Sequence, residues 1–299
     1  MKIGIIGGGA IGLLVAARLS HTHQITIVTH TPIQADEINE NGISVIDEYG
    51  DCIYKNINAI NIANSKNIIR SQDIILLTVK QTALKQVLPY LEDNAPAIVF
   101  LQNGMSHFND INGLRIASIY TGVVEHGSVL INHTTVHHTG NGMIKIGLTK
   151  GAEVPGIESL DTKGFPVRLI PEIRPVHIEK LIVNSVINPL TSVLRVRNGE
   201  LIKNTYYVEL IKSVCQEVCE SLLIPEAERQ TYLEKIFMIC EQTAQNTSSM
   251  LRDLQLGRKT EIEAILGYCI QEAEKNDTHP YQCKLLYRMV RGLEESEEM

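Results

Sequence analysis

Three polar side chains recur at helical spacing inside an otherwise apolar segment, VHIEKLIVNSVINPL at residues 176–190. Lys180, Asn184 and Asn188 stand at positions i, i+4 and i+8, so at about 100° per residue they share one stripe of a helix. A helix that is apolar on its other faces is predicted to be buried, and a buried polar stripe must be hydrogen-bonded. The stripe therefore either binds a ligand, or bonds neighbouring helices while Lys180 extends its charge to solvent.

A glycine-rich turn lies between a predicted strand, Lys2–Ile6, and a helical pattern that continues from Leu13. Strand, glycine turn and helix follow one another in the dinucleotide-binding fingerprint GxGxxG, which is a weak signal alone and a strong one in this context. The first glycine permits the tight turn, the second lets backbone approach a pyrophosphate, and the third lets the helix pack closely. The turn consists of Gly7, Gly8, Gly9, Ala10, Ile11 and Gly12.

The residues after the second predicted strand, Gln24–Val28, bear on the choice of cofactor. Thr29, His30 and Thr31 stand where a carboxylate would bind the ribose 2′-hydroxyl of NAD. Without that carboxylate nothing repels a 2′-phosphate, which favours NADP over NAD. His30 is either a donor to that phosphate or a solvated loop residue.

Two further polar residues follow predicted buried strands. Lys80 ends the apolar run 74–79, and Asn103 follows the strand 97–101. Because ligands bind at the carboxyl ends of strands in open α/β sheets, both are candidate binding residues. On position alone, Lys80 is equally an exposed loop lysine, and Asn103 with Gly104 equally forms a turn.

Four histidines gather between two predicted strands and suggest a metal site. No Cys, Asp or Glu stands at ligand spacing beside them, and alternation within a strand is the simpler account, so we expect no metal. The histidines are His126, His133, His137 and His138, and the flanking strands cover residues 116–124 and 143–148.

The pattern changes near Glu172–Pro175 from alternating strands to long helices. Before this point a hairpin is predicted from residues 43–46 and 53–60 around Tyr49-Gly50. We expect an α/β architecture, with a Rossmann-type NADP-binding domain over residues 1–174 and an all-helical substrate and catalytic domain over residues 175–299. Helical periodicity covers residues 206–223, 229–245, 260–275 and 280–293, and the acidic residues 294–298 are interpreted as solvated.

Composition narrows the class of protein. The 299 residues are 44% hydrophobic and 20% charged, with a net charge of −7 and no Lys/Arg run, so neither nucleic acid nor a membrane surface is an expected partner. The six cysteines include no CxxC pair, and we expect reduced, buried thiols, no disulfide and a cytoplasmic location. The uncharged run after Lys2 is interrupted by three glycines, which argues against a secretory signal.

With these residues placed, the sequence resembles the ketopantoate reductase (2-dehydropantoate 2-reductase) family over nearly its whole length. The last four of the matching blocks are highly specific in combination. The blocks are GGGAIG (7–12), VK (79–80), QNGM (102–105), GVVEHG (122–127), HTGNG (138–142), KLIVNSVINPL (180–190), RNGEL (197–201), SSMLRD (248–253) and GRKTEIEAILG (257–267).

The resemblance implies reduction of 2-dehydropantoate to (R)-pantoate with NADPH, on the route to pantothenate and coenzyme A, with a small-molecule 2-keto acid as substrate and a homodimer as a compatible assembly. The family's usual 2′-phosphate arginine falls on His30, which leaves the strictness of NADPH preference open. By position, the catalytic lysine falls on Lys180, the substrate-binding residues on Asn103, Asn184, Asn188, Asn198 and Ser249, and the cofactor contacts on the glycine turn, Lys80, Asn103, Ser128 and Glu261.

These residues fit a hydride transfer to a keto carbon. Charge then develops on the carbonyl oxygen, and the Lys180 ammonium would stabilise it and supply the proton. Partial burial would lower the pKa of Lys180 toward neutrality, and Glu261 would oppose that fall. Two alternatives stay open: a reductase of another 2-keto acid, and a non-catalytic NADP-binding regulator, which would have no reason to keep Lys180, the asparagines, Ser249 and Glu261 together.

Overall fold

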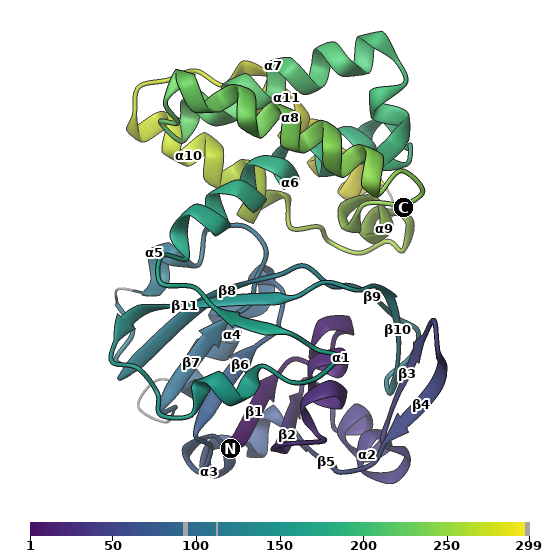
Figure 1. Cartoon of the computed structure of the whole chain (residues 1–299), viewed down its shortest axis with the longest axis vertical. Helices are drawn as coiled ribbons and strands as arrows, with labels where there is room; N and C mark the ends of the chain where they lie inside the picture. Colours follow the sequence, from purple (N-terminus) through teal and green to yellow (C-terminus); the bar gives the residue numbers. More distant parts are fainter. Residues whose placement is uncertain (92–94, 112, 297–299) are drawn as a thin grey trace. The chain divides into compact units, whose positions relative to one another are not determined.

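The computed structural model describes residues 1–91, 95–111 and 113–296. The chain divides into two compact units (Figure 1). The first unit comprises Met1–Gln102 and Asn109–Arg174, and the second comprises Asn103–Phe108 and Pro175–Met299. The short segment 103–108, which follows a strand of the first unit, thus packs with the helical second unit.

Within the described residues, the main sheet of the first unit has eight strands in the order β12-β11-β8-β7-β6-β1-β2-β5. The six strands from β8 to β5 in this order are parallel, and β11 runs antiparallel to β8. A parallel sheet is covered on both faces, which explains why β6 is apolar and buried at every position. The strands are β1 (Lys2–Ile6), β2 (Gln24–Thr29), β5 (Ile57–Asn61), β6 (Ile74–Leu77), β7 (Ala97–Phe100), β8 (Ser118–Val124), β11 (Ile144–Gly151) and β12 (Val167–Leu169).

The order of the strands reverses at β1. From β1 the chain adds β2 and then β5 on one side, and later adds β6, β7 and β8 on the other. The carboxyl end of β1 is therefore the topological switch point where ligands bind in open α/β sheets. The glycine turn lies there, followed by α1 (Ala10–Leu19). The predicted fold class is confirmed in this unit.

A second, four-stranded sheet in the described part of this unit has the order β4-β3-β10-β9. It contacts α1 through β3, β9 and β10. His137 is exposed and His138 is buried along β10, which confirms the alternation expected for these histidines. Its strands are β3 (Ile43–Asp47), β4 (Gly50–Tyr54), β9 (Gly127–Leu130) and β10 (Thr135–Gly140).

The prediction of a single strand over residues 53–60 is wrong. Tyr54 ends β4, which pairs with β3 in the small sheet, and Ile57 begins β5, which pairs with β2 in the main sheet. The exposed residues Lys55 and Asn56 lie between them in neither strand. The other elements of this unit are α2 (Pro32–Asn41), η1 (Ile62–Asn64), α3 (Lys66–Arg70), α4 (Gln81–Leu91), α5 (Phe108–Ile111, starting in the second unit) and η2 (Ile157–Leu160).

The second unit is helical, as predicted. The helix predicted over residues 260–275 is a π-helix, η4 (Glu263–Gly267), followed by α10 (Tyr268–Lys275), and α9 (Ser249–Gln255) was not predicted. A separate apolar core joins these helices. The remaining elements are α6 (Arg174–Leu194), η3 (Asn198–Ile202), α7 (Thr205–Ser221), α8 (Glu226–Gln242) and α11 (Tyr281–Ser296).

The interpretation of residues 294–298 as a solvated tail is wrong for Glu294. Its carboxylate is buried and accepts hydrogen bonds from the backbone amide and the hydroxyl of Thr260, at 2.7 and 2.6 Å. Arg291 donates to the other carboxylate oxygen at 2.8 Å. Periodicity could not reveal this because Thr260 lies outside α11, the helix that carries Glu294. Glu297 and Glu298 lie outside the described residues.

Two further expectations concern cysteines and membranes. All six cysteines are free thiols; five are buried, whereas Cys52 on β4 is exposed, contrary to the expectation of buried thiols. Among the described residues, no helix has both the length and the apolar character needed to cross a membrane.

Candidate active site

The glycine turn has the geometry that its sequence predicted. Gly7 has φ +122°, a conformation that favours glycine. A Cβ on Gly12 would overlap the carbonyl oxygen of Gly7, so the start of α1 packs directly against the turn. Gly9, the N-cap of α1, has no atom within 4 Å of the position a Cβ would take. The turn is therefore closed on one side and open at Gly9.

Two carbonyl groups of the turn are held by side chains. The Thr78 hydroxyl donates to the carbonyl of Gly7 at 3.0 Å, and Gln34 Nε2 donates to the carbonyl of Gly8 at 2.8 Å. Within the described chain, the amides of Gly8 and Gly9 donate to no protein acceptor. Because the first amides of a helix have no partner inside the helix, this end of α1 offers a row of donors to an anion.

The three polar residues after β2 differ in what they can offer. Thr29 is buried and its hydroxyl donates to the carbonyl of Thr31 at 2.8 Å, while the Thr31 hydroxyl caps α2 by accepting from the Gln34 amide. Asn61 fixes the carbonyl of His30 through a 2.8 Å hydrogen bond, and the His30 side chain is exposed. Of the three side chains, His30 is thus the exposed one that makes no hydrogen bond in the described chain.

Lys80 and Ser128 are the other predicted cofactor residues in the first unit. Lys80 follows β6 and is half-buried, and Gln102 holds the backbone before it by donating to the carbonyls of Leu77 and Val79, both at 3.1 Å. Ser128 lies in β9 opposite His138, and its hydroxyl oxygen is buried with no hydrogen-bond partner in the described chain. No hydrogen bond within the described chain therefore accounts for the burial of the Ser128 hydroxyl.

The predicted polar stripe lies on α6. Lys180 and Asn184 are half-buried and Asn188 is buried, 7% exposed, whereas the apolar residues between them belong to the core. The alternative in which both asparagines bond neighbouring helices gains no support, because neither carboxamide has a hydrogen-bond partner in the described chain. The two asparagines of the stripe thus present carboxamides without a hydrogen-bond partner in the described chain.

Asn103 and Glu261 meet in the second unit although they are far apart in sequence. Asn103 Nδ2 donates to Glu261 Oε2 at 2.9 Å. The next residue, Gly104, has φ +76° and packs so closely on Ala264 that a Cβ would overlap the Ala264 carbonyl. The amide of Met105 donates to that same carbonyl at 3.2 Å. The π-helix η4 therefore anchors the segment that carries Asn103, and π-helical turns are frequent at functional sites.

Hydrogen bonds also join the elements that carry the remaining predicted substrate residues. The Thr191 hydroxyl, on α6, is hydrogen-bonded to the Ser248 hydroxyl at 2.8 Å, and Ser248 caps α9, whose first residue is the exposed Ser249. Asn198 is buried at the start of η3, where its Nδ2 donates to the Thr243 hydroxyl at 2.9 Å. Its Oδ1 is buried with no partner in the described residues, so it retains an acceptor for a ligand.

Two buried histidines contact each other in the second unit, and one of them, His177, precedes Lys180 on α6. The rings of His107 and His177 are 5.8 Å apart, and Phe108 packs edge-on against His177. Burial, and then the charge of Lys180, lower the pKa of His177 to about 4, while burial and then His177 lower the pKa of His107 to about 3. Both are neutral at neutral pH, so Lys180 is the cation of this group.

In the first unit, His126 and His138 contact each other at 3.1 Å between Nδ1 and Nε2. Burial, followed by the charges of His138 and Arg18, lowers the pKa of His126 to about 4. The His126 ring also stacks on Phe165 at 4.5 Å. In the described chain, no group of three or more His, Cys, Asp or Glu side chains is arranged to hold a metal ion.

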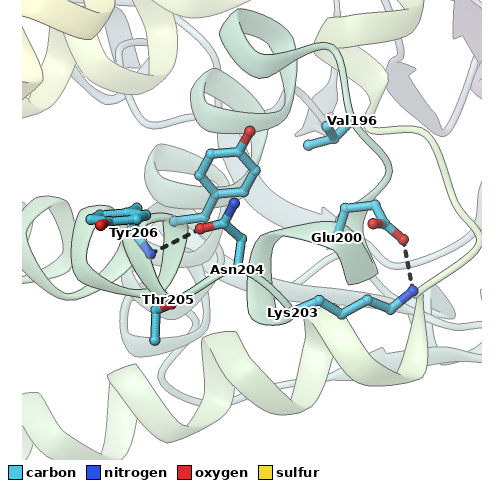
Figure 2. Close-up of a pocket in the computed structure, with 7 residues that line it drawn as sticks. Val196, Glu200, Lys203, Asn204, Thr205 and Tyr206 are labelled. Carbon is cyan, nitrogen blue, oxygen red and sulfur yellow. Dashed lines mark hydrogen bonds and ion pairs between the residues drawn. The ribbon is translucent and has the colours of Figure 1, made fainter.

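A surface pocket of about 610 Å³ lies elsewhere in the second unit, at the start of α7 (Figure 2). Three of its polar side chains are already engaged: Lys203 pairs with Glu200 at 2.7 Å, and Asn204 caps α7 by accepting from the amide of Tyr206. None of the predicted site residues lines it. We therefore do not assign the substrate to this pocket.

The predicted site residues fall into two groups, one in each unit. Sequence reasoning missed the side chains that position them, chiefly Gln34, Thr78 and Gln102. The apolar run 74–79 holds a polar Thr78, which was a usable signal. Gln34 and Gln102 carried no such signal, because an amide in a helix or after a strand is commonplace. The first group comprises the glycine turn, His30, Lys80 and Ser128, and the second Asn103, Lys180, Asn184, Asn188, Asn198, Ser249 and Glu261.

A parallel sheet with a glycine turn at its switch point, joined in one chain to a helical unit with a lysine and amide stripe, defines a class of Rossmann-type dinucleotide-binding proteins with a helical second domain. Comparison with known proteins identifies the family. The family models "Ketopantoate reductase PanE/ApbA" and "Ketopantoate reductase PanE/ApbA C terminal" match residues 3–151 and 172–294. The chain belongs to the ketopantoate reductase family.

Relatives match over both units. The chain is 39% identical to the 2-dehydropantoate 2-reductase of Bacillus subtilis (strain 168), covering 98% of each chain, and 35% identical to that of Listeria innocua, covering 98% of this chain and 97% of the other. A crystal structure of the probable 2-dehydropantoate 2-reductase from Bacillus subtilis superposes with a TM-score of 0.88 at 37% identity, covering 98% of this chain and 100% of the other. A D-mandelate dehydrogenase structure also reaches 0.88, with both chains fully covered, but at 20% identity it shows the shared fold alone.

Proposed function

We propose that this chain is an NADP-dependent oxidoreductase that reduces 2-dehydropantoate to (R)-pantoate with NADPH, a step toward pantothenate and coenzyme A, with Lys180 as the general acid. The observation that carries this proposal is the match to relatives named for this reaction over 98% of both chains. The match includes the helical unit, where the candidate catalytic residues lie.

The first unit fits a dinucleotide by three observations. The turn is open at Gly9, the amides of Gly8 and Gly9 have no acceptor in the described chain, and α1 begins directly after them. These donors suit a pyrophosphate, and Lys80 and His30 follow β6 and β2, the two parallel strands that flank β1. When bound, the reduced nicotinamide supplies the hydride. We assign residues 1–174 to cofactor binding, including contacts from Ser128 and Asn103, with a further contact from Glu261.

Lys180 stabilises the substrate oxygen and supplies its proton. The ammonium stands beside negative charge as that charge develops on the carbonyl oxygen, and a preorganised cation is most effective there. The buried His107 and His177 are neutral and add no competing positive charge at neutral pH. Asn184 and Asn188 continue the same stripe, with carboxamides that have no partner inside the described protein.

Neutral donors and acceptors hold the substrate. Asn188, Asn198 and Ser249 lie on α6, η3 and the start of α9, which are linked by the Thr191–Ser248 hydrogen bond and by the Asn198 amide bonded to the carbonyl of Asn246 at 3.1 Å. Asn103 is oriented by Glu261. We assign these four residues and Asn184 to binding the substrate carboxylate and hydroxyl. We assign residues 175–299 to the catalytic domain, with which the segment that carries Asn103 packs.

A reductase of a different 2-keto acid is the second candidate, because a D-mandelate dehydrogenase shares this architecture. The deciding experiment compares NADPH oxidation by the purified protein with ketopantoate and with simpler 2-keto acids. The proposal expects kcat/KM to be highest for ketopantoate. A higher kcat/KM for another keto acid selects the second candidate, and no turnover of any keto acid selects a non-catalytic regulator.

Two assignments concern the protein in the cell. We infer a cytoplasmic enzyme, supported by six cysteines that are all free thiols. We also infer a homodimer, since a dimeric ketopantoate reductase from Staphylococcus aureus shares the fold at a TM-score of 0.78. Sedimentation equilibrium of the purified protein measures the assembly directly.

A further inference from the structure

We propose that Gln34 is a positioning residue for the dinucleotide loop, because its side-chain amide fixes the peptide between Gly8 and Gly9. The Gly9 amide is thereby aimed at the cofactor pyrophosphate. This inference rests on the proposed use of NADPH and adds to it a residue outside the glycine turn.

The contacts of Gln34 are specific. It lies in the first turn of α2, is 8% exposed, and has its own backbone amide bound by the Thr31 hydroxyl. Its Nε2 donates to the carbonyl of Gly8 at 2.8 Å and to the carbonyl of His133 at 2.9 Å. Both hydrogens of the amide are therefore used, and they join α2, the glycine turn and the β9–β10 connection.

The contact with Gly8 fixes a direction. In a planar trans peptide the carbonyl of one residue and the amide of the next point in opposite directions. Because Gln34 holds the carbonyl of Gly8, the amide of Gly9 faces away from α2. Thr78 acts in the same way on the carbonyl of Gly7, and so on the amide of Gly8. These are the two amides that have no acceptor in the described chain.

The turn is also shaped to receive Gln34. A Cβ on Gly8 would overlap the carboxamide of Gln34, whereas Gly9 has open space on its Cα. Gly8 must therefore be a glycine, because Gln34 fills the space beside it on one side of the loop. Gly9 leaves the other side of the loop open for an anion.

Helix α2 does not depend on Gln34 for its attachment. Asn39, on the same helix, makes two hydrogen bonds to Ala59 of β5, at 2.9 Å to its carbonyl and 2.8 Å from its amide. Glu37 contacts the His133 ring at 3.1 Å. Asn39 is therefore a matched control: it is another carboxamide that binds backbone from α2, but it lies away from the glycine turn.

The test measures dissociation constants for NADPH and NADH from the fluorescence of the bound reduced nicotinamide. Gln34→Met keeps the side-chain length and removes both donors. We expect it to raise both constants about tenfold and to leave their ratio unchanged, because the pyrophosphate is common to both cofactors. It should raise KM for NADPH while kcat at saturating NADPH stays within about twofold, and Asn39→Ala should leave both constants within about twofold.

A second variant, Gln34→Glu, covers the case in which Gln34→Met does not fold. A carboxylate at this place faces two carbonyl oxygens, so NADPH binding should weaken at neutral pH and recover as the carboxyl gains a proton at lower pH. A merely structural role would not produce that recovery. If Gln34→Glu binds NADPH as tightly as wild type at all pH values, the proposal is overturned.

Three other results overturn it. Unchanged binding by a folded Gln34→Met shows that the contact does not orient the loop, and equal weakening in Asn39→Ala assigns the effect to the seating of α2. A larger loss for NADPH than for NADH places Gln34 at the 2′-phosphate instead. If the wild-type protein binds neither cofactor, the proposed function is wrong as well. If wild type and Gln34→Met bind NADPH equally well, only this inference is wrong.

Discussion

The side-chain amide of Asn103 donates a hydrogen bond to the carboxylate of Glu261, with 2.9 Å between Nδ2 and Oε2. A carboxylate can only accept, so this contact fixes which end of the Asn103 amide faces it. The carbonyl oxygen of Asn103 is left to accept from a ligand. Both residues were predicted as ligand contacts, yet nothing in the sequence predicted that they contact each other.

Replacing Asn103 with aspartate should impair turnover in a pH-dependent way. Asn103→Asp places two carboxylates in contact, so one of the two is expected to have a raised pKa and the ligand-facing geometry is lost at neutral pH. We expect kcat/KM for ketopantoate to fall on the order of 10²-fold at neutral pH and to recover partly as pH falls. Asn141→Asp is the control, because the exposed Asn141 makes the same kind of contact with Glu48 at 2.8 Å. A pH-independent loss in Asn103→Asp would contradict the argument.

The glycine turn offers a pair of substitutions with separable effects. Gly12→Ala forces a Cβ into the Gly7 carbonyl, so the melting temperature should fall and NADPH binding should weaken with it. Gly9→Ala meets open space at an ordinary φ of −81°, so the melting temperature should hold while the added methyl group weakens NADPH binding. Thermal unfolding and cofactor titration of both variants check this. If the melting temperature falls equally in Gly12→Ala and Gly9→Ala, the difference in space beside the two glycines does not decide stability, and the argument is wrong.

We expect cofactor preference to depend on His30, whose side chain is exposed just after β2. We expect wild type to prefer NADPH over NADH in kcat/KM, because no carboxylate there repels a 2′-phosphate. His30→Arg should increase that preference about tenfold by adding a permanent charge and a forked donor. If wild type already prefers NADH, the 2′-phosphate argument is wrong.

The buried histidines predict that the protein loses stability in acid. Burial lowers the pKa of His177 to about 4, below its ordinary value of about 6.5, so on acidification the unfolded chain takes up the proton first. The contribution of this histidine is therefore intact above about pH 6.5 and is lost as pH falls toward about 4, at up to about 1.4 kcal/mol per pH unit.

Denaturant unfolding of wild type and His177→Leu between neutral and mildly acidic pH measures this loss. The variant should have a flatter acid dependence of the free energy of unfolding, whereas His137→Gln, which changes an exposed histidine, should match wild type. An unchanged slope in His177→Leu would show that His177 is not held neutral by burial.

The sequence predicted those parts of the molecule that depend on local pattern. The strand, glycine turn and helix at residues 2–19 and the polar stripe of α6 follow from periodicity and from the conformational needs of glycine. The run 53–60 misled because its alternation continues across Lys55 and Asn56, whereas its two halves pair with different sheets. Partners on other elements decided the rest, as Glu294 shows by its hydrogen bonds to Thr260.

The positioning contacts were beyond sequence reasoning for the same reason. In the sequence, Gln34 is not distinguishable from an ordinary amide on a surface helix. Only the fold places its Nε2 2.8 Å from the carbonyl oxygen of Gly8. Asn103 and Glu261 are separated by 158 positions, and their two segments are joined by the packing of Gly104 on Ala264 and by the hydrogen bond from Met105 to Ala264.

The role of Lys180 is tested most directly by the rate of NADPH oxidation with saturating ketopantoate in wild type and Lys180→Ala. Direct titration with NADPH and thermal unfolding of the same variant show whether cofactor binding and the fold are retained. The account predicts that they are, and that turnover falls on the order of 10²-fold or more, because the cation that stabilises the substrate oxygen and supplies its proton is gone. A Lys180→Ala protein that turns over ketopantoate at the wild-type rate would contradict it.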